Sequence, residues 1–154
     1  MQTRLTSLFY LASPIVLAPM ALATGGALAM ACARAGALAL VGGGYGDLAW
    51  TQREHRMALA ISENDPQRAR LGVGFITWKL DDDASALDWV LDQSAATRPR
   101  AVMLSFGDPR PYAARISAGG ARPVRCSGWT NFLKPSRLAL RSSWRKAVKR
   151  VATA

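Results

Sequence analysis

Four short segments combine an apolar run with a glycine or proline turn, and these turns are where the sequence offers ligand contacts. The segments are Ser13–Ala21 (SPIVLAPMA), Ala37–Asp47 (ALALVGGGYGD), Leu71–Trp78 (LGVGFITW) and Ala101–Pro109 (AVMLSFGDP). Glycine tolerates positive φ and lets a ligand approach the backbone closely. A methionine thioether is a soft contact for a flat ring. Such turns suit a flat cofactor or a phosphate, and each also has a purely structural interpretation as a strand-to-helix connection.

Several common sites are excluded. The turn Val41–Asp47 lacks the Lys and Ser or Thr of a P-loop, and no acidic residue follows at the spacing of a dinucleotide fingerprint. Cys32 and Cys126 are far apart and His55 is the only histidine, so no zinc-type cluster can form. His55 lies in the polar stretch Thr51–Arg56, which predicts a solvated surface residue and not a catalytic base.

The elements that would position these turns alternate between strand and helix. Apolar runs predict strands over residues 15–18, 37–41, 71–76 and 101–104, and helical composition follows over residues 27–34, 48–63, 85–95 and 111–117. Strands that are apolar on both faces indicate a parallel sheet covered by helices. The crossover rule leaves an open doubly wound sheet or part of a barrel. In either fold the four turns lie at one end of the sheet, where ligands bind.

Length and charge divide the chain. Its 154 residues are fewer than the roughly 250 of a complete (β/α)8 barrel. All 10 acidic residues and 11 of the 20 basic ones lie in the first 120 positions, so the remaining 34 positions carry 9 basic residues and no acidic one. We therefore expect a partial barrel domain over residues 1–121 and a basic tail over residues 122–154.

Taken in order, the motifs APMA, VGGGYGD, GVGFITW and AVMLSFGDP resemble the nitronate monooxygenase family, also called 2-nitropropane dioxygenase-like, over about four fifths of the chain. The resemblance implies an α/β fold of the TIM-barrel type, present here as about four βα units. It also implies non-covalently bound FMN and the oxidation of alkyl nitronates by O2. By this resemblance Pro19, Met20 and Ala21 line the flavin together with Gly74, which stands where one branch of the family has asparagine.

The family's catalytic histidine lies in a Gly-Gly-His loop after the sixth strand, and this sequence has no such loop, so no catalytic residue is assigned. The tail offers a reason. If GC-rich codons encode Ser143–Ala154, triplets made from the last base of one codon and the first two of the next spell VAQGxEAGGHG, which matches that loop. We interpret the tail as the product of a frameshift between Gly119 and Cys126, and expect a truncated, inactive member of the family.

Two alternatives stay open. Arg4, the apolar run from Leu8 and the triplet Ala21–Ala23 imitate the signal of an exported or membrane-anchored protein, although Pro14 and Pro19 would break a membrane helix. The basic tail with its aromatic residues could instead be a nucleic-acid-binding module. The favoured interpretation predicts a cytoplasmic oxidoreductase that takes a nitronate and O2, binds neither nucleic acid nor membrane, and self-associates through exposed half-barrel edges.

Overall fold

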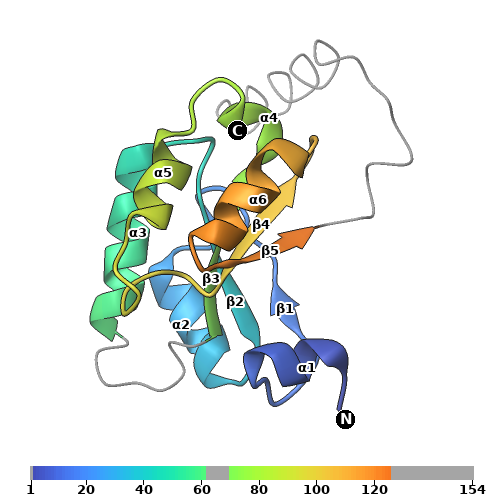
Figure 1. Cartoon of the computed structure of the whole chain (residues 1–154). Helices are drawn as coiled ribbons and strands as arrows, with labels where there is room; N and C mark the ends of the chain where they lie inside the picture. Colours follow the sequence, from blue (N-terminus) through green and yellow to red (C-terminus); the bar gives the residue numbers. More distant parts are fainter. Residues whose placement is uncertain (1, 62–69, 126–154) are drawn as a thin grey trace, which may run out of the picture.

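The computed structural model describes residues 2–61 and 70–125. Its strands are β1 (Val16–Leu17), β2 (Leu38–Gly42), β3 (Leu71–Ile76), β4 (Ala101–Ser105) and β5 (Arg122–Arg125), which form one parallel sheet in the order β1-β2-β3-β4-β5 (Figure 1). In a barrel wall, neighbouring strands follow one another in sequence, as they do here. A doubly wound sheet instead reverses its strand order at a switch point. The predicted α/β architecture of the partial TIM-barrel type is confirmed.

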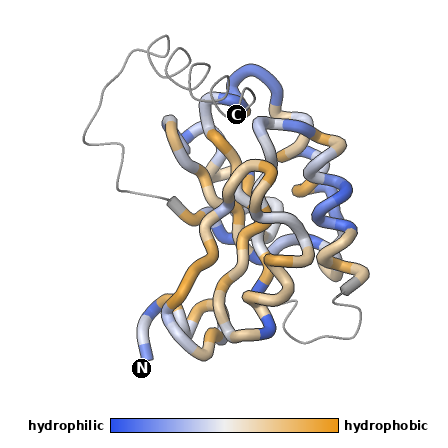
Figure 2. The backbone as a smooth tube through the Cα atoms, turned by 180° about the vertical axis from the view of Figure 1, so that it is seen from behind, coloured by the Kyte–Doolittle hydropathy of each residue, from blue (hydrophilic) through white to orange (hydrophobic). Residues whose placement is uncertain are grey.

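The helices α2 (Gly26–Arg34), α3 (Leu48–Ile61), α5 (Ser85–Leu91) and α6 (Arg110–Ala118) cover one face of this sheet (Figure 1). In Figure 2 the central strands are mostly hydrophobic, whereas α3 has hydrophilic stretches. All four helices were predicted, but α5 ends at Leu91 and not near residue 95, and the predicted end of α3 at residues 62–63 lies outside the described residues. No helix in the described ranges, 2–61 and 70–125, is long and apolar enough to cross a membrane.

Three elements were not predicted: α1 (Arg4–Phe9), α4 (Thr77–Leu80) and β5. No strand was predicted in the segment assigned to the basic tail, yet Arg122–Arg125 pairs in register with Ala101–Leu104. The segment RPVR has little strand character of its own, and the unpaired edge of β4 is what makes it a strand. Residues 126–154 lie outside the described residues, so the separate tail and its frameshift origin stay predictions.

The two faces of the sheet have separate cores. On the helix-covered side, strand residues such as Val41, Val73 and Leu104 pack against α2, α5 and α6. On the other side, Leu38, Leu40 and Ala101 pack with α1 and the chain that follows it, through Phe9 and Leu11. Because side chains alternate along a strand, one sequence run supplies both cores. The helix α1 therefore fills the inner face at the end where the strands begin (Figure 1).

The histidine prediction was wrong. His55 is 2% exposed, its Nε2 lies 2.9 Å from the Thr97 carbonyl oxygen, and its ring meets Trp89 edge to face at a centroid separation of 5.6 Å. The polar composition of α3 suggested solvent exposure. However, α5 and the loop before β4 pack on one side of α3, and they cover this position. His55 therefore belongs to the helical layer.

Candidate functional site

A cavity of about 300 Å³ opens at the end of the sheet where β1 to β4 terminate. It is lined by Pro19, Met20, Ala21, Gly42, Gly43, Gly44, Tyr45, Gly74, Phe75, Ile76, Ser105 and Phe106. Its volume is near the lower end of the range of ligand pockets, about 300–1,000 Å³. The structure therefore brings together all four residues predicted to contact a flavin, Pro19, Met20, Ala21 and Gly74. Their role as flavin contacts stays a prediction.

The first side of the cavity is the turn that follows β1, residues 18–24, which we call the Pro–Met turn. The amides of Ala23 and Thr24 both donate to the Met20 carbonyl oxygen, at 3.2 and 3.0 Å. The Gly42 amide donates to the Thr24 carbonyl oxygen at 2.9 Å, which ties the turn to β2. Leu22 has a φ of 60°, a left-handed conformation that non-glycine residues rarely adopt. The turn is thus compact, strained at one residue and attached to the sheet.

Two glycines make room for this turn. Gly42 and Gly74 are register partners on neighbouring strands. A Cβ atom at Gly42 would overlap the Met20 carbonyl group, and one at Gly74 would overlap the Pro19 ring. Glycine within a strand leaves room for a ring that packs close to the backbone. In the structure that ring, at Gly74, is the side chain of Pro19.

The second side of the cavity is the glycine-rich turn after β2. Gly44 and Gly46 have φ angles of 62° and 85°, which explains why this turn needs glycine. The Gly43 amide donates to the Gly74 carbonyl oxygen at 2.8 Å. An Asp47 carboxylate oxygen accepts the Trp50 amide at 2.9 Å and so caps the first turn of α3. A phosphate would compete with this carboxylate for the helix N-terminus, so this turn does not favour a phosphate.

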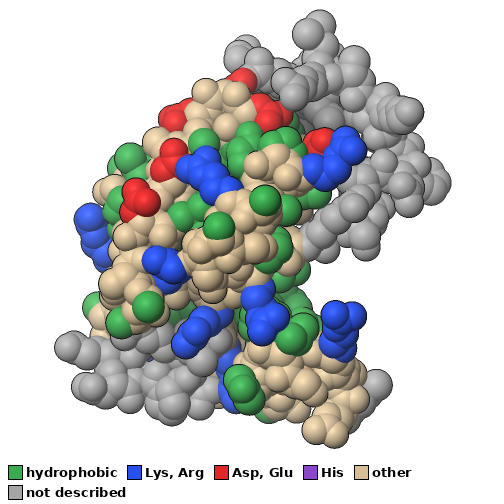
Figure 3. Space-filling view, in the orientation of Figure 1, with side chains coloured by type: hydrophobic (Ala, Val, Ile, Leu, Met, Phe, Trp, Pro, Cys, Tyr) green, Lys and Arg blue, Asp and Glu red, His purple; other side chains and the backbone are tan. Residues whose placement is uncertain are grey.

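The charges around this end of the molecule also do not favour a phosphate. In Figure 3 the acidic side chains gather at the upper end, where α4 lies, while Lys and Arg side chains lie mainly over the middle and lower parts. The acidic residues after the strands include Asp47, the run Asp81–Asp83 and Asp108. The Asp108 carboxylate accepts from the Arg110 Nε at 2.9 Å, and it raises the pKa of this exposed guanidinium. The charges of the described loops therefore favour the binding of a flat neutral group over that of an anion.

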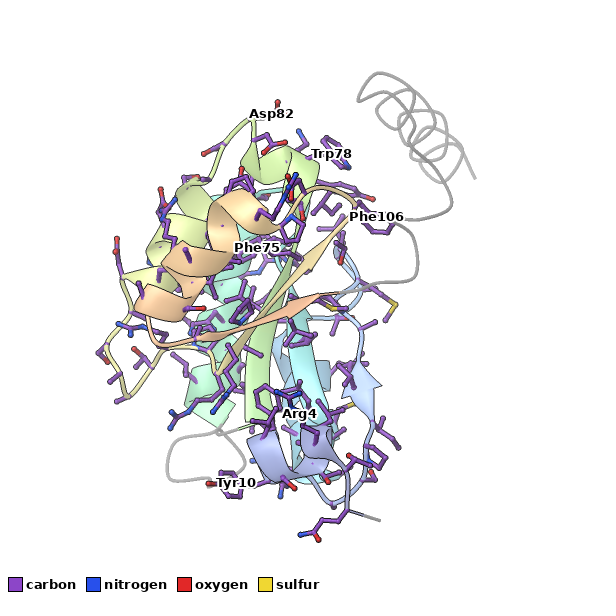
Figure 4. The ribbon with its side chains drawn as sticks, turned by 45° about the vertical axis from the view of Figure 1, so that its right-hand side comes forward. Arg4, Tyr10, Phe75, Trp78, Asp82 and Phe106 are labelled. Atoms are coloured by element: carbon purple, nitrogen blue, oxygen red, sulfur yellow. The ribbon has the colours of Figure 1, made fainter. Side chains whose placement is uncertain are left out.

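The turn after β4 completes the lining with Ser105 and Phe106. Phe106 has a φ of 59°, and such a left-handed non-glycine residue costs on the order of 1–3 kcal/mol. Figure 4 shows Phe106 near the upper end with Trp78, whereas Arg4 and Tyr10 mark the opposite end. Among the described lining residues, Tyr45 and Ser105 carry hydroxyl groups, and none carries a carboxylate, an imidazole or an ammonium group. His55 is not part of the lining.

Sequence reasoning missed the contributions of Gly42 to Tyr45, Phe75, Ile76, Ser105 and Phe106 as individual lining residues. Their motifs had been singled out, and the ends of parallel strands were the signal that located them. It also missed Thr24, the last residue of the Pro–Met turn, which is fully buried and belongs to no motif.

The fold is similar to that of FabK from Thermotoga maritima, with a TM-score of 0.65 and 22% sequence identity, over 81% of this chain and 37% of the FabK chain. A mutant of the same FabK matches equally well over 39% of its chain. This chain therefore spans less than two fifths of the FabK chains it matches. No protein-family model and no curated protein matches the sequence. The likeness and the strand order together show that residues 2–61 and 70–125 have the fold of a partial TIM barrel.

Proposed function

We propose that this chain forms the part of a flavin-dependent oxidoreductase that contacts the flavin ring. More narrowly, we propose that it is a relative of the FMN-dependent nitronate monooxygenases, which oxidise alkyl nitronates with O2. One observation carries the proposal. The cavity at the strand ends gathers Pro19, Met20, Ala21 and Gly74, the residues that the family resemblance assigns to the flavin. Strand ends are where TIM-barrel enzymes hold their ligands.

The lining fits the ring part of a flavin. It consists mainly of glycine backbone, the Pro–Met turn and the apolar side chains of Phe75, Ile76 and Phe106, with hydroxyl groups at Tyr45 and Ser105. Ligand pockets commonly combine an apolar lining with a few polar groups that fix orientation. A bound flavin would supply the electron-transfer chemistry. The phosphate of FMN finds no comparable cradle among the described residues, because Asp47 already caps α3.

The residues of this chain would bind and orient the ring and keep water from one side of it. The described lining holds no carboxylate or imidazole to act as the general base. The only histidine of the chain, His55, is buried against Thr97 and Trp89 and does not line the cavity. General acid or base catalysis typically contributes about 10²- to 10⁴-fold to a rate. We therefore propose binding without measurable nitronate turnover for the 154-residue chain.

Flavin titration tests the proposal. The purified chain should carry little or no flavin through gel filtration, yet quench the fluorescence of added riboflavin and added FMN with similar, weak affinities, since the phosphate adds no contact. Ala21→Trp, which fills the cavity, should abolish the quenching. Ala23→Trp is the matched control because Ala23 is an exposed neighbour outside the lining. Absence of binding, or equal binding by both variants, would exclude a flavin site here, and stoichiometric yellow protein would exclude weak binding.

A further inference from the structure

We propose that Thr24 is a positioning residue that holds the Pro–Met turn in the shape the cavity requires. The proposal deepens the proposed function, since it concerns the same cavity and takes a flavin ring as the ligand. Thr24 does not line the cavity, and it would act through Met20 and Ala18.

The Thr24 hydroxyl connects both arms of the turn. It donates to the Ala18 carbonyl oxygen at 3.1 Å and accepts the Met20 amide at 3.2 Å. The side chain is 0% exposed. Without the hydroxyl, the Met20 amide and the Ala18 carbonyl group lose the partner that they share. Because Ala18 and Met20 are exposed, these two groups would turn to water for replacement hydrogen bonds, and the turn would open toward solvent.

Among the described residues, the rest of the turn is attached through backbone hydrogen bonds and fits into the space left by Gly42 and Gly74. That space permits the position of Pro19 and Met20 but does not enforce it. Leu22, with its φ of 60°, favours relaxation of the turn. Because Pro19, Met20 and Ala21 form one side of the cavity, any shift of the turn changes the ligand contacts directly.

The test compares Thr24→Val, which keeps the shape and removes the hydroxyl, with Thr24→Ser, which keeps the hydroxyl. Thr6→Val is the matched control, because the buried Thr6 hydroxyl likewise accepts a backbone amide, that of Thr3 at 2.8 Å, and donates to the Thr3 carbonyl oxygen at 2.9 Å, but lies on α1. Amide hydrogen exchange of Met20 and the Met20 methyl resonance are measured without flavin. Riboflavin affinity is measured by fluorescence quenching.

Thr24→Val should speed exchange of the Met20 amide at least tenfold, shift the Met20 methyl resonance and weaken riboflavin binding about fivefold to tenfold, the loss expected for one hydrogen bond. Thr24→Ser should give a Met20 exchange rate, a Met20 methyl resonance and a riboflavin affinity close to those of the unmodified chain. Thr6→Val should leave the Met20 signals and the affinity unchanged. If Thr24→Val does not fold, Thr24→Cys, whose thiol is a weaker hydrogen-bonding group, takes its place and should give intermediate values.

Unchanged Met20 exchange and resonance in the folded Thr24 variant would overturn the proposal whether or not flavin binds. A moved Met20 with unaltered riboflavin affinity would overturn it too, because the turn would then not shape the ligand contacts. If the unmodified chain binds no riboflavin, the proposed flavin function fails, while the exchange data still decide whether Thr24 holds the turn.

Discussion

The inner face of the sheet differs at its two ends. Where the strands begin, Leu38, Leu40 and Ala101 are fully buried against the α1 region. Where they end, the same face carries Gly42 and Gly74, the Pro–Met turn lies over these glycines, and a cavity opens beside it. The strands are continuous from one end to the other, so the packed end differs from the hollow one in the size of the strand residues and in the segment that covers them. In TIM barrels the first end serves stability and the second serves ligands.

Arginines strengthen the packed end. Arg70, at the start of β3, donates from Nε to the Tyr10 carbonyl oxygen at 2.9 Å and from Nη1 to that of Ala33 at 3.3 Å. These carbonyls lie at the C-terminal ends of α1 and α2, where a positive charge is favourable. At the hollow end acidic side chains gather, and Arg110 there is paired with Asp108 (Figure 3). The two ends therefore differ in charge as well as in packing.

The largest expected effect concerns catalysis at the hollow end. Oxygen consumption with propyl nitronate and added FMN should be undetectable for the 154-residue chain, because the described cavity holds no carboxylate or imidazole to act as the general base. If the tail is a frameshift product, a single-base correction upstream of Ser127 should restore activity. Changing the restored Gly-Gly-His histidine to asparagine should remove it again. Substantial turnover by the chain as written would contradict the expectation, and a corrected protein that binds FMN without turnover would contradict the nitronate assignment.

The next effect concerns stability at the packed end. Leu40→Ala should lower the free energy of unfolding by about 2–5 kcal/mol, since it leaves a cavity among fully buried side chains. Met20→Ala, at a side chain that is 46% exposed, should cost less than about 1 kcal/mol. Urea unfolding followed by circular dichroism measures both values. Equal losses would show that the two ends are packed alike.

A smaller effect tests the glycine beneath the Pro–Met turn. Gly74→Ala should cost about 1–3 kcal/mol, because the new methyl group displaces Pro19, and it should also weaken riboflavin quenching. Gly119→Ala, at a helical φ of −69° after α6, is the control and should change stability less and quenching not at all. If Gly74→Ala left both stability and quenching intact, Pro19 would not depend on this glycine.

The smallest effect concerns association. The edges at β1 and β5 have no strand partner within the described residues, and Ile15 beside β1 is 58% exposed, so we expect reversible self-association. Ile15→Lys should shift a concentration series in analytical ultracentrifugation toward the monomer, whereas Leu28→Lys on α2, an exposed apolar position away from both edges, should not. A monomer at every concentration would exclude association through these edges.

The sequence by itself determined β1 to β4, the main helix that follows each of them and the end of the sheet where their turns meet. These features depend on local apolar runs and on glycine and proline, and parallel strands necessarily bring the turns together. The turn with Pro19, Met20 and Ala21 could therefore be placed at the same end of the sheet as the strand with Gly74, while the choice of these four residues as flavin contacts came from the family resemblance.

Only the tertiary structure decided which atoms occupy the space beside each of these residues. It buried His55 beneath α5, made a strand of Arg122–Arg125, filled the space at Gly74 with Pro19 and placed the Thr24 hydroxyl between the two arms of the turn. Most of these contacts join segments distant in sequence, so they depend on strand register and helix packing. Periodicity shows which side of an element is buried, but it does not identify the residue on the other side of the contact.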